Sequence, residues 1–150
     1  MNLQQALVYW KQVRAGLVDT IQKFNDSDLA YKPFLSSWPA GQIMLHIAEA
    51  EEGWFRFAVM RDLDKWPDGY TLENYPTRDS ISATLATVHE YTVQFLESLT
   101  GDDSEKIISV PWGENIPLPW IIRHVVEHEI HHRGELSLIL GILGRDGLDV

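Results

Sequence analysis

Three histidines recur at every fourth position near the end of the chain: His124, His128 and His132. On an α-helix this spacing places the three imidazoles on one face. The same face carries the aliphatic side chains Ile121, Val125, Leu136, Ile139 and Leu143. A helix normally buries such a face against the core of its protein. Because a buried polar group without a partner costs about 1–3 kcal/mol, these imidazoles require either hydrogen-bond partners or a metal ion.

Apolar residues spaced three and four apart predict four long helices. The helices are expected over about residues 2–25, 36–64, 78–100 and 118–143. Residues typical of helix ends mark the boundaries: Ser36 or Ser37 as the cap of the second helix with Pro39 in its first turn, Thr77 or Asp79 as the cap of the third, and Gly144 directly after the fourth.

The connection between helices two and three is long. Residues 65–78 contain Pro67, Gly69 and Pro76, which exclude a regular helix there. Such a length favours a crossover over a tight hairpin. Between helices three and four, residues 107–110 and 114–116 predict a short β-hairpin. The expected fold is all-α: one domain over residues 1–150, a four-helix bundle with a long crossover connection between helices two and three.

Charge and composition exclude several classes of partner. The net charge is −10, and the 12 lysines and arginines form no run. We therefore expect no nucleic-acid binding and no binding to anionic membranes. No apolar run approaches the roughly 20 residues that span a bilayer, and the first residues do not resemble a signal peptide. The chain has no cysteine, so thiolate ligands and nucleophiles are excluded. A cytoplasmic location is the expectation.

His128 and His132 have the spacing that brings two imidazoles to one metal ion from adjacent helical turns. His46 lies within the apolar stripe of helix two and is the natural third ligand if helices two and four are neighbours. Three histidines leave coordination positions open for water or substrate, as in catalytic sites. The donors suit Zn, Ni, Fe or Cu. The alternative is that these histidines are buried and hydrogen-bonded to carbonyls or carboxylates.

The remaining histidines are less suited to the site. His131 is rotated by about 100° from His132 and is expected at the edge or surface of the helix. His124 lies one turn from His128 and is expected either beside the site or at the end of the bundle. His89 adjoins the apolar stripe of helix three and is expected to flank it rather than bind metal.

Residues 128–132 also match H-E-x-x-H, the zinc-peptidase signature in which the glutamate is a general base. A peptidase needs a further ligand downstream, and only residues 133–150 remain. The extended pattern also fails, because Glu135 and Leu138 stand where it requires glycine and histidine. A peptidase is therefore not expected. Glu129 as a base in another hydrolysis stays open.

The inward-facing His46, followed by H-x-x-x-H-R-G-E from His128 to Glu135, resembles the DinB/YfiT-like superfamily of metal-binding bundles. The likeness covers almost the whole chain, and Glu135 departs from the glutamine that is common there. The resemblance implies a metal site at His46, His128 and His132. Members of this superfamily are described as metal-dependent hydrolases or as enzymes that use bacillithiol or mycothiol, and many form homodimers. The resemblance therefore implies an activity of one of these kinds and a homodimer.

Two functions are therefore expected. The first is an enzyme whose three-histidine metal site acts on a small molecule, either by lowering the pKa of a bound water or by activating a low-molecular-weight thiol. Glu49 and Glu129 are its candidate catalytic helpers, and Arg133 is a candidate anchor for an anionic group or a partner of Glu129 or Glu52. The second is a non-enzymatic, stress-related dimer that holds a structural metal.

Overall fold

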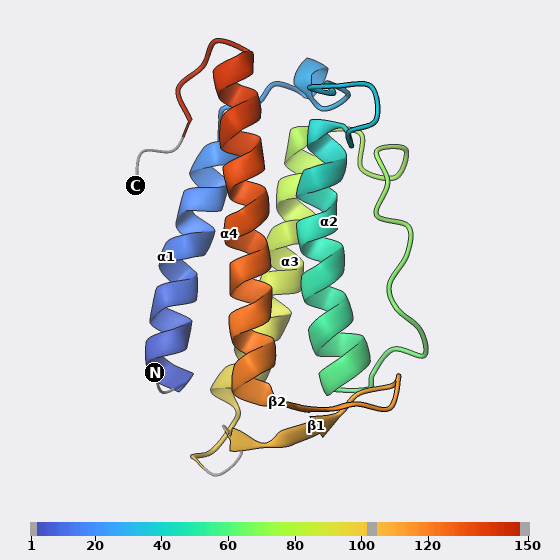
Figure 1. Cartoon of the computed structure of the whole chain (residues 1–150), viewed down its shortest axis with the longest axis vertical. Coiled ribbons are helices and arrows are strands. Elements are labelled where there is room, and N and C mark those ends of the chain that lie inside the picture. The colour runs from blue at the N-terminus through green and yellow to red at the C-terminus, as the bar shows by residue number, and fades with distance from the viewer. Residues whose placement is uncertain (1–2, 102–104, 148–150) are drawn as a thin grey trace.

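The computed structural model describes residues 3–101 and 105–147. It is built from four helices: α1 (Leu3–Gln22), α2 (Ala40–Glu52), α3 (Arg78–Glu97) and α4 (Leu118–Ile142). The strands β1 (Ile107–Ser109) and β2 (Asn115–Pro117) form an antiparallel hairpin between α3 and α4. The all-α four-helix bundle is therefore confirmed (Figure 1). Within the described residues, no helix has both the length and the apolar character needed to span a membrane.

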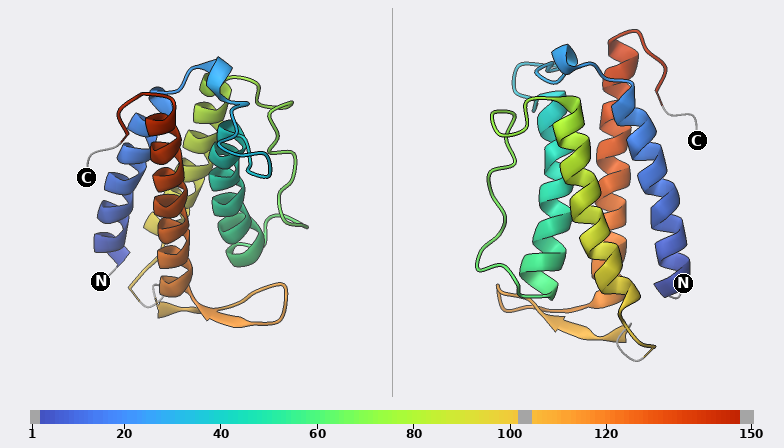
Figure 2. Two further views of the ribbon diagram at one scale, coloured as in Figure 1. Left: turned by 45° about the horizontal axis from the view of Figure 1, so that its top comes forward. Right: turned by 180° about the vertical axis from the view of Figure 1, so that it is seen from behind.

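The long connection follows from the direction of the helices. α1 and α4 run one way along the bundle, and α2 and α3 run the other way (Figure 1). α2 packs against both α3 and α4, and α4 packs against α1. Because α2 and α3 are parallel neighbours, the chain must return along the bundle before α3 can begin. Residues 60–77 make this return on the outside of α2, as the predicted crossover (Figure 2).

The second helix differs from its prediction at both ends. Neither serine caps it: the N-cap is Pro39, and the hydroxyl of Ser37 instead donates to the carbonyl of Phe34 at 2.7 Å. The α-helix also stops early and continues as a π-helical segment, Gly53–Val59. Directly after this segment, the Met60 N–H donates to the Phe55 carbonyl, five residues earlier. The chain then leaves the helix at Arg61, whose φ is 61°. The predicted helical continuation to residue 64 is wrong because this left-handed residue ends it.

Other boundaries agree with the sequence. The Thr77 side chain accepts from the Ser80 N–H at the start of α3, so the predicted cap is confirmed. The hairpin forms around the Pro111–Gly113 turn, with Ile108 opposite Ile116. Gly144 follows α4 with a φ of 77°, the left-handed conformation that suits glycine after a helix.

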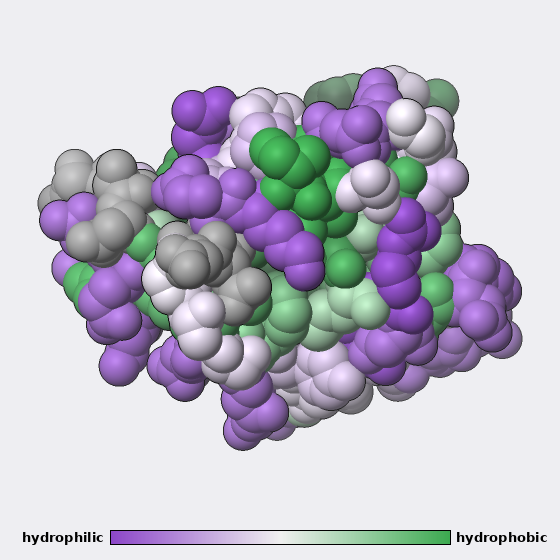
Figure 3. All heavy atoms as spheres, turned by 90° about the horizontal axis from the view of Figure 1, so that it is seen from below, coloured by the Kyte–Doolittle hydropathy of each residue, from purple (hydrophilic) through white to green (hydrophobic). Residues whose placement is uncertain are grey.

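The core consists of two apolar clusters stacked along the bundle. Representative members are Leu17, Met44, Ile81 and Leu136 in one cluster, and Phe55, Leu96, Ile121 and Val125 in the other. Between the clusters lie three buried charged residues: Arg14, Glu51 and Glu129. The second cluster reaches the end of the bundle that carries the hairpin, where hydrophobic side chains gather near the middle of the surface (Figure 3).

Candidate metal centre

The three histidines expected to bind metal meet between α2 and α4. His128 Nε2 lies 3.1 Å from His46 Nε2 and 3.1 Å from His132 Nε2. His46 and His128 are half-buried, and His132 is buried. One potential ligand atom of each residue lies within 4.8 Å of the other two. The structure thus brings one residue of α2 and two of α4 to a single point, through the packing of these helices on each other.

Carboxylates hold the opposite side of two of these rings. His132 Nδ1 lies 2.6 Å from Glu135 Oε2, and His46 Nδ1 lies 3.5 Å from Glu49 Oε2. The other oxygen of Glu49 accepts a hydrogen bond of 3.2 Å from Trp66 Nε1. An ionised carboxylate can only accept, so each Nδ1 carries the proton. In a neutral ring the Nε2 atom then presents its lone pair to the point of convergence.

The environment favours neutral imidazoles. Burial, together with the neighbouring rings of His132 and His46, lowers the pKa of His128 to about 3. Burial also lowers the pKa of His132, although the nearby Glu135 opposes this effect. Both rings are therefore uncharged at neutral pH, which is the state in which an imidazole nitrogen can bind a metal ion.

This donor set fits a divalent transition metal. One nitrogen of His128 can donate a single proton, so it cannot satisfy the lone pairs of both neighbouring rings at once. A metal ion bonded to imidazoles at about 2.0–2.1 Å holds two such nitrogens about 3.3 Å apart in tetrahedral geometry. The observed separations of 3.1 Å are close to that value. A cation at this point would satisfy all three lone pairs.

The other histidines lie outside this cluster. The side chain of His131 is 67% exposed, which confirms its expected surface position. Its ring lies 3.4 Å from Glu135, so it forms a second group with Glu135 and the buried His132. His124 stacks on Trp120, with ring centroids 4.8 Å apart. His89 lies against the interior of the bundle, where its Nδ1 is 2.9 Å from Glu51 Oε1.

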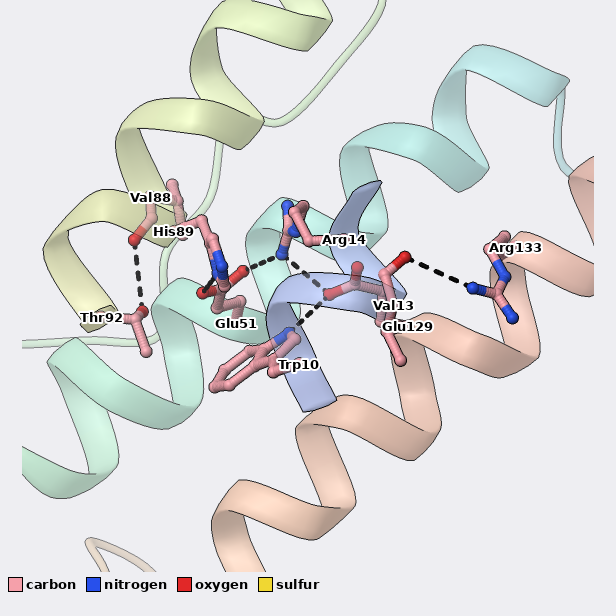
Figure 4. Close-up of polar contacts among 9 residues, drawn as sticks. All are labelled: Trp10, Val13, Arg14, Glu51, Val88, His89, Thr92, Glu129 and Arg133. Carbon is pink, nitrogen blue, oxygen red and sulfur yellow. Dashed lines mark hydrogen bonds and ion pairs between the residues drawn. The ribbon is translucent and has the colours of Figure 1, made fainter. Parts of the chain in front are cut away.

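Glu129 takes part in a different arrangement. Its Oε2 accepts hydrogen bonds from Trp10 Nε1 at 2.8 Å and from Arg14 Nη2 at 2.9 Å (Figure 4). The same Arg14 nitrogen lies 2.5 Å from Glu51 Oε2. We call Arg14, Glu51, His89 and Glu129 the ionic layer. Glu129 is 1% exposed and is not part of either group of converging ligand atoms found in the described residues. The geometry gives no support to its expected role as a base.

The two carboxylates of the ionic layer respond differently to their surroundings. Burial alone would raise the pKa of Glu51, but the charge of Arg14 and the hydrogen bond with His89 outweigh it and lower this pKa. Burial raises the pKa of Glu129, and the opposing effects of Arg14 and Trp10 do not overcome it. The layer therefore favours one firmly ionised carboxylate and one that takes up a proton more readily.

The remaining expected site residues are placed as follows. Glu49 lies beside the three histidines, where its hydrogen bonds orient His46. Arg133 points toward α1, and its Nη1 donates to the Val13 carbonyl at 3.3 Å (Figure 4). Its hydrogen bond is thus to backbone rather than to Glu129 or Glu52. Catalysis by Glu49 and anion binding by Arg133 stay predictions.

Sequence reasoning did not identify three of the residues that organise this region. Glu135 is the carboxylate that orients His132, at the position where this chain departs from the glutamine of the family pattern. Arg14 and Glu51 both interrupt apolar stripes, of α1 and α2 respectively, and both are buried. Charged residues at inward positions of two helices were the signal that could have identified the ionic layer, because buried charges require partners.

Two proteins of Bacillus subtilis are similar to this chain in sequence, each at about one quarter identity. YjoA of Bacillus subtilis is 25% identical over 131 residues, which cover 85% of this chain and 81% of YjoA. YizA of the same organism is 26% identical over 97 residues, which cover 63% of this chain. The chain spans 58% of the length of YizA.

Solved structures share the fold. A DinB-like protein from Bacillus cereus superposes with a TM-score of 0.78 at 17% identity, covering 99% of this chain and 97% of that protein. YfiT from Bacillus subtilis, described as a probable metal-dependent hydrolase, gives a TM-score of 0.67 at 21% identity, covering 93% and 87%. A mycothiol-dependent maleylpyruvate isomerase gives 0.55 at 15% identity, covering 88% of this chain and 60% of the enzyme.

The family itself is shown by a sequence model. The model that describes the DinB superfamily matches residues 9–136. This range begins in α1, ends in α4 and contains all three of the converging histidines. The chain therefore belongs to the DinB superfamily.

Proposed function

We propose that this chain is a metal-dependent enzyme that acts on a small molecule by hydrolysis or by thiol transfer. The observation that carries the proposal is the convergence of three imidazoles, with His128 Nε2 3.1 Å from each of its two neighbours. Two structural neighbours support it: YfiT is described as a probable metal-dependent hydrolase, and another neighbour is a mycothiol-dependent isomerase.

Each part of the chain has a defined task in this proposal. His46, His128 and His132 hold a divalent transition metal such as Zn, Ni or Fe through their Nε2 atoms. Glu135 and Glu49 fix the tautomer and orientation of two of these rings by accepting from Nδ1. When bound, the ion supplies Lewis acidity to a water, a carbonyl or a thiol.

The number of protein ligands favours catalysis over a purely structural role. Structural zinc sites are usually closed by four protein ligands, whereas catalytic sites use three and leave a position for water or substrate. Three donors converge here within the described residues. The surrounding carboxylates Glu49 and Glu135 accept from imidazole N–H groups, so they position the ligands.

Metal content provides the first test. We expect the purified protein to hold one equivalent of transition metal and His128→Ala to lose most of it. His131→Ala is the matched control, because its exposed ring lies outside the converging group, and it should retain the metal. Equal metal content in His128→Ala and the wild type would contradict the site.

Activity provides the second test. The protein is loaded with Zn, Ni or Fe and assayed against ester and amide substrates and against thiols paired with electrophiles. Turnover that disappears in His128→Ala but persists in His131→Ala supports the enzyme. Bound metal with no exchangeable ligand position, shown by a failure of small chelating ligands to bind, would instead support the alternative of a structural ion.

A further inference from the structure

Four of the six tryptophans form one cluster near the metal centre. Trp54 lies at its middle, with ring centroids 6.4 Å from Trp66, 5.4 Å from Trp112 and 6.0 Å from Trp120. His124 completes the cluster, 5.1 Å from Trp54 and stacked on Trp120. We call these five residues the tryptophan wall. They come from the π-helical segment, the crossover, the hairpin turn and α4, which meet at one end of α2 (Figure 1).

The wall is continuous with the metal centre through two routes. His124 lies one helical turn before His128 on α4, a rise of about 6 Å. Trp66 donates to Glu49, and Glu49 in turn lies against His46. A small molecule held at the three histidines therefore has aromatic side chains within reach along α4.

Two rings of the wall are partly exposed to solvent. Trp112 is 46% exposed and Trp120 is 39% exposed. A gathering of large exposed apolar side chains beside a candidate site is typical of a binding surface.

The hydrogen-bonding groups of the wall indicate what it would bind. Trp112 Nε1 donates to Glu114 at 2.8 Å, and Trp66 Nε1 donates to Glu49 at 3.2 Å. These two N–H groups are therefore occupied within the chain, and what their rings offer a ligand is π surface. Both partners are carboxylates, which would repel an anionic group placed against the wall. Planar aromatic rings stack on π surface of this kind.

We propose that the tryptophan wall is the substrate subsite for an uncharged aromatic group, carried by a molecule whose polar end faces the three histidines. This inference rests on the proposed function, because it assigns the part of the substrate that extends beyond the metal. Within the wall, Trp112 and Trp120 present the exposed rings and would contact this group.

Three hydroxamates that share one metal-binding group provide the test. Acetohydroxamate, cyclohexanecarbohydroxamate and benzohydroxamate are titrated by calorimetry into the zinc-loaded protein. Stacking on an aromatic side chain contributes a factor of about 2 to 12 in affinity. We therefore expect benzohydroxamate to bind more tightly than both other compounds, by at least about 2-fold over the cyclohexyl compound.

Variants separate the ring from its volume. Trp120→Leu keeps an apolar side chain on α4, and we expect it to lose most of the preference for benzohydroxamate while binding acetohydroxamate as the wild type does. The double variant Trp112→Ala/Trp120→Ala should lose the preference completely. Tyr9→Ala is the matched control, because this aromatic residue is similarly exposed at 44% but lies on α1, and it should keep the preference.

The outcomes distinguish the two proposals. Equal affinity of the phenyl and cyclohexyl compounds, or an unchanged preference in the double variant, would overturn the subsite and leave the metal centre intact. If no hydroxamate binds although zinc is retained, the ion has no open position, and both the proposed function and this inference are overturned. Zinc content measured after each titration separates these cases from loss of the ion.

Discussion

Arg14 is the residue of the ionic layer whose removal should be felt most strongly. Its Nη2 atom lies 2.5 Å from Glu51 and 2.9 Å from Glu129, and both carboxylates are 1% exposed. Arg14→Met keeps a long apolar side chain but removes the positive charge between them. The two buried carboxylates then face each other, with His89 and Trp10 still donating to them.

The expected loss of stability can be worked from these contacts. Removing one partner of a buried ion pair costs about 3–5 kcal/mol, because the other charge is left buried without compensation. Against this, Arg14 Nε and Nη1 have no hydrogen-bond partner among the described residues, and removing such a group relieves a penalty of about 1–3 kcal/mol. The cost of unpairing two carboxylates outweighs this relief. We expect Arg14→Met to lower the free energy of unfolding by about 2–3 kcal/mol at pH 7.

The loss should depend on pH. In the wild type Arg14 is a principal reason that the pKa of Glu51 is lowered, so its contribution is present at neutral pH and is lost as pH falls through the folded pKa. Without Arg14, burial raises the pKa of both carboxylates above their unfolded values. The folded variant then binds more protons than the unfolded chain, so its stability increases as pH falls from 7 to 5. The deficit relative to wild type is therefore expected to shrink at pH 5.

Urea unfolding followed by circular dichroism measures this difference, with chelator present so that metal binding does not contribute. Adding Glu129→Gln to Arg14→Met removes one of the facing charges and should restore at least about 1 kcal/mol at pH 7. Arg133→Met is the control: that side chain donates to a backbone carbonyl rather than to a carboxylate, so its effect should be small and independent of pH. A deficit of the same size at both pH values, with no recovery in the double variant, would refute the electrostatic explanation.

Three further substitutions test how the metal centre is supported. Gly53→Ala would place a Cβ 2.3 Å from the Trp66 ring, and we expect overpacking to cost about 1–3 kcal/mol in urea unfolding; unchanged stability would show that the ring moves freely. Gly141→Ala is its matched control in α4, because a Cβ there meets nothing within 4 Å, and a gain of up to about 1 kcal/mol is expected from helix propensity. Glu135→Gln removes the charge beside His132 and should weaken zinc binding about 10-fold in a competition titration; a dissociation constant equal to that of the wild type would contradict this supporting role.

The helices and their order could be predicted because each has an apolar stripe of helical period and an identifiable end. Thr77 and Gly144 were recognisable because a cap and a left-handed glycine have local causes. The convergence of His46 with His128 and His132 also had a sequence signal, since all three interrupt apolar faces. The helix ends could thus be predicted from local causes, whereas the meeting of His46 with His128 and His132 rested on their inward positions and on the family resemblance.

The start of α2 and the π-helical segment depend on contacts that the spacing of apolar residues does not reveal. Ser37 lies close enough to α2 to cap it, but its hydroxyl closes a turn with Phe34 instead. Gly53 begins the π-helical segment, at the position where the Trp66 ring packs against the backbone. Trp66 lies 13 residues further along the chain, in the crossover. The spacing of residues within α2 therefore could not predict this contact.

The H-E-x-x-H pattern shows how one short stretch serves two sites. Adjacent helical residues are rotated by about 100°, so His128 and Glu129 cannot both face α2. His128 and His132 point to the metal centre, while Glu129 points between α1 and α2 to Arg14. The ionic layer thus anchors α4 at the residue next to a metal ligand. If that anchor sets the position of His128, Arg14→Met should weaken zinc binding as well as lower the stability of the fold. Gly141→Ala should leave both the zinc affinity and the pH dependence of that affinity unchanged.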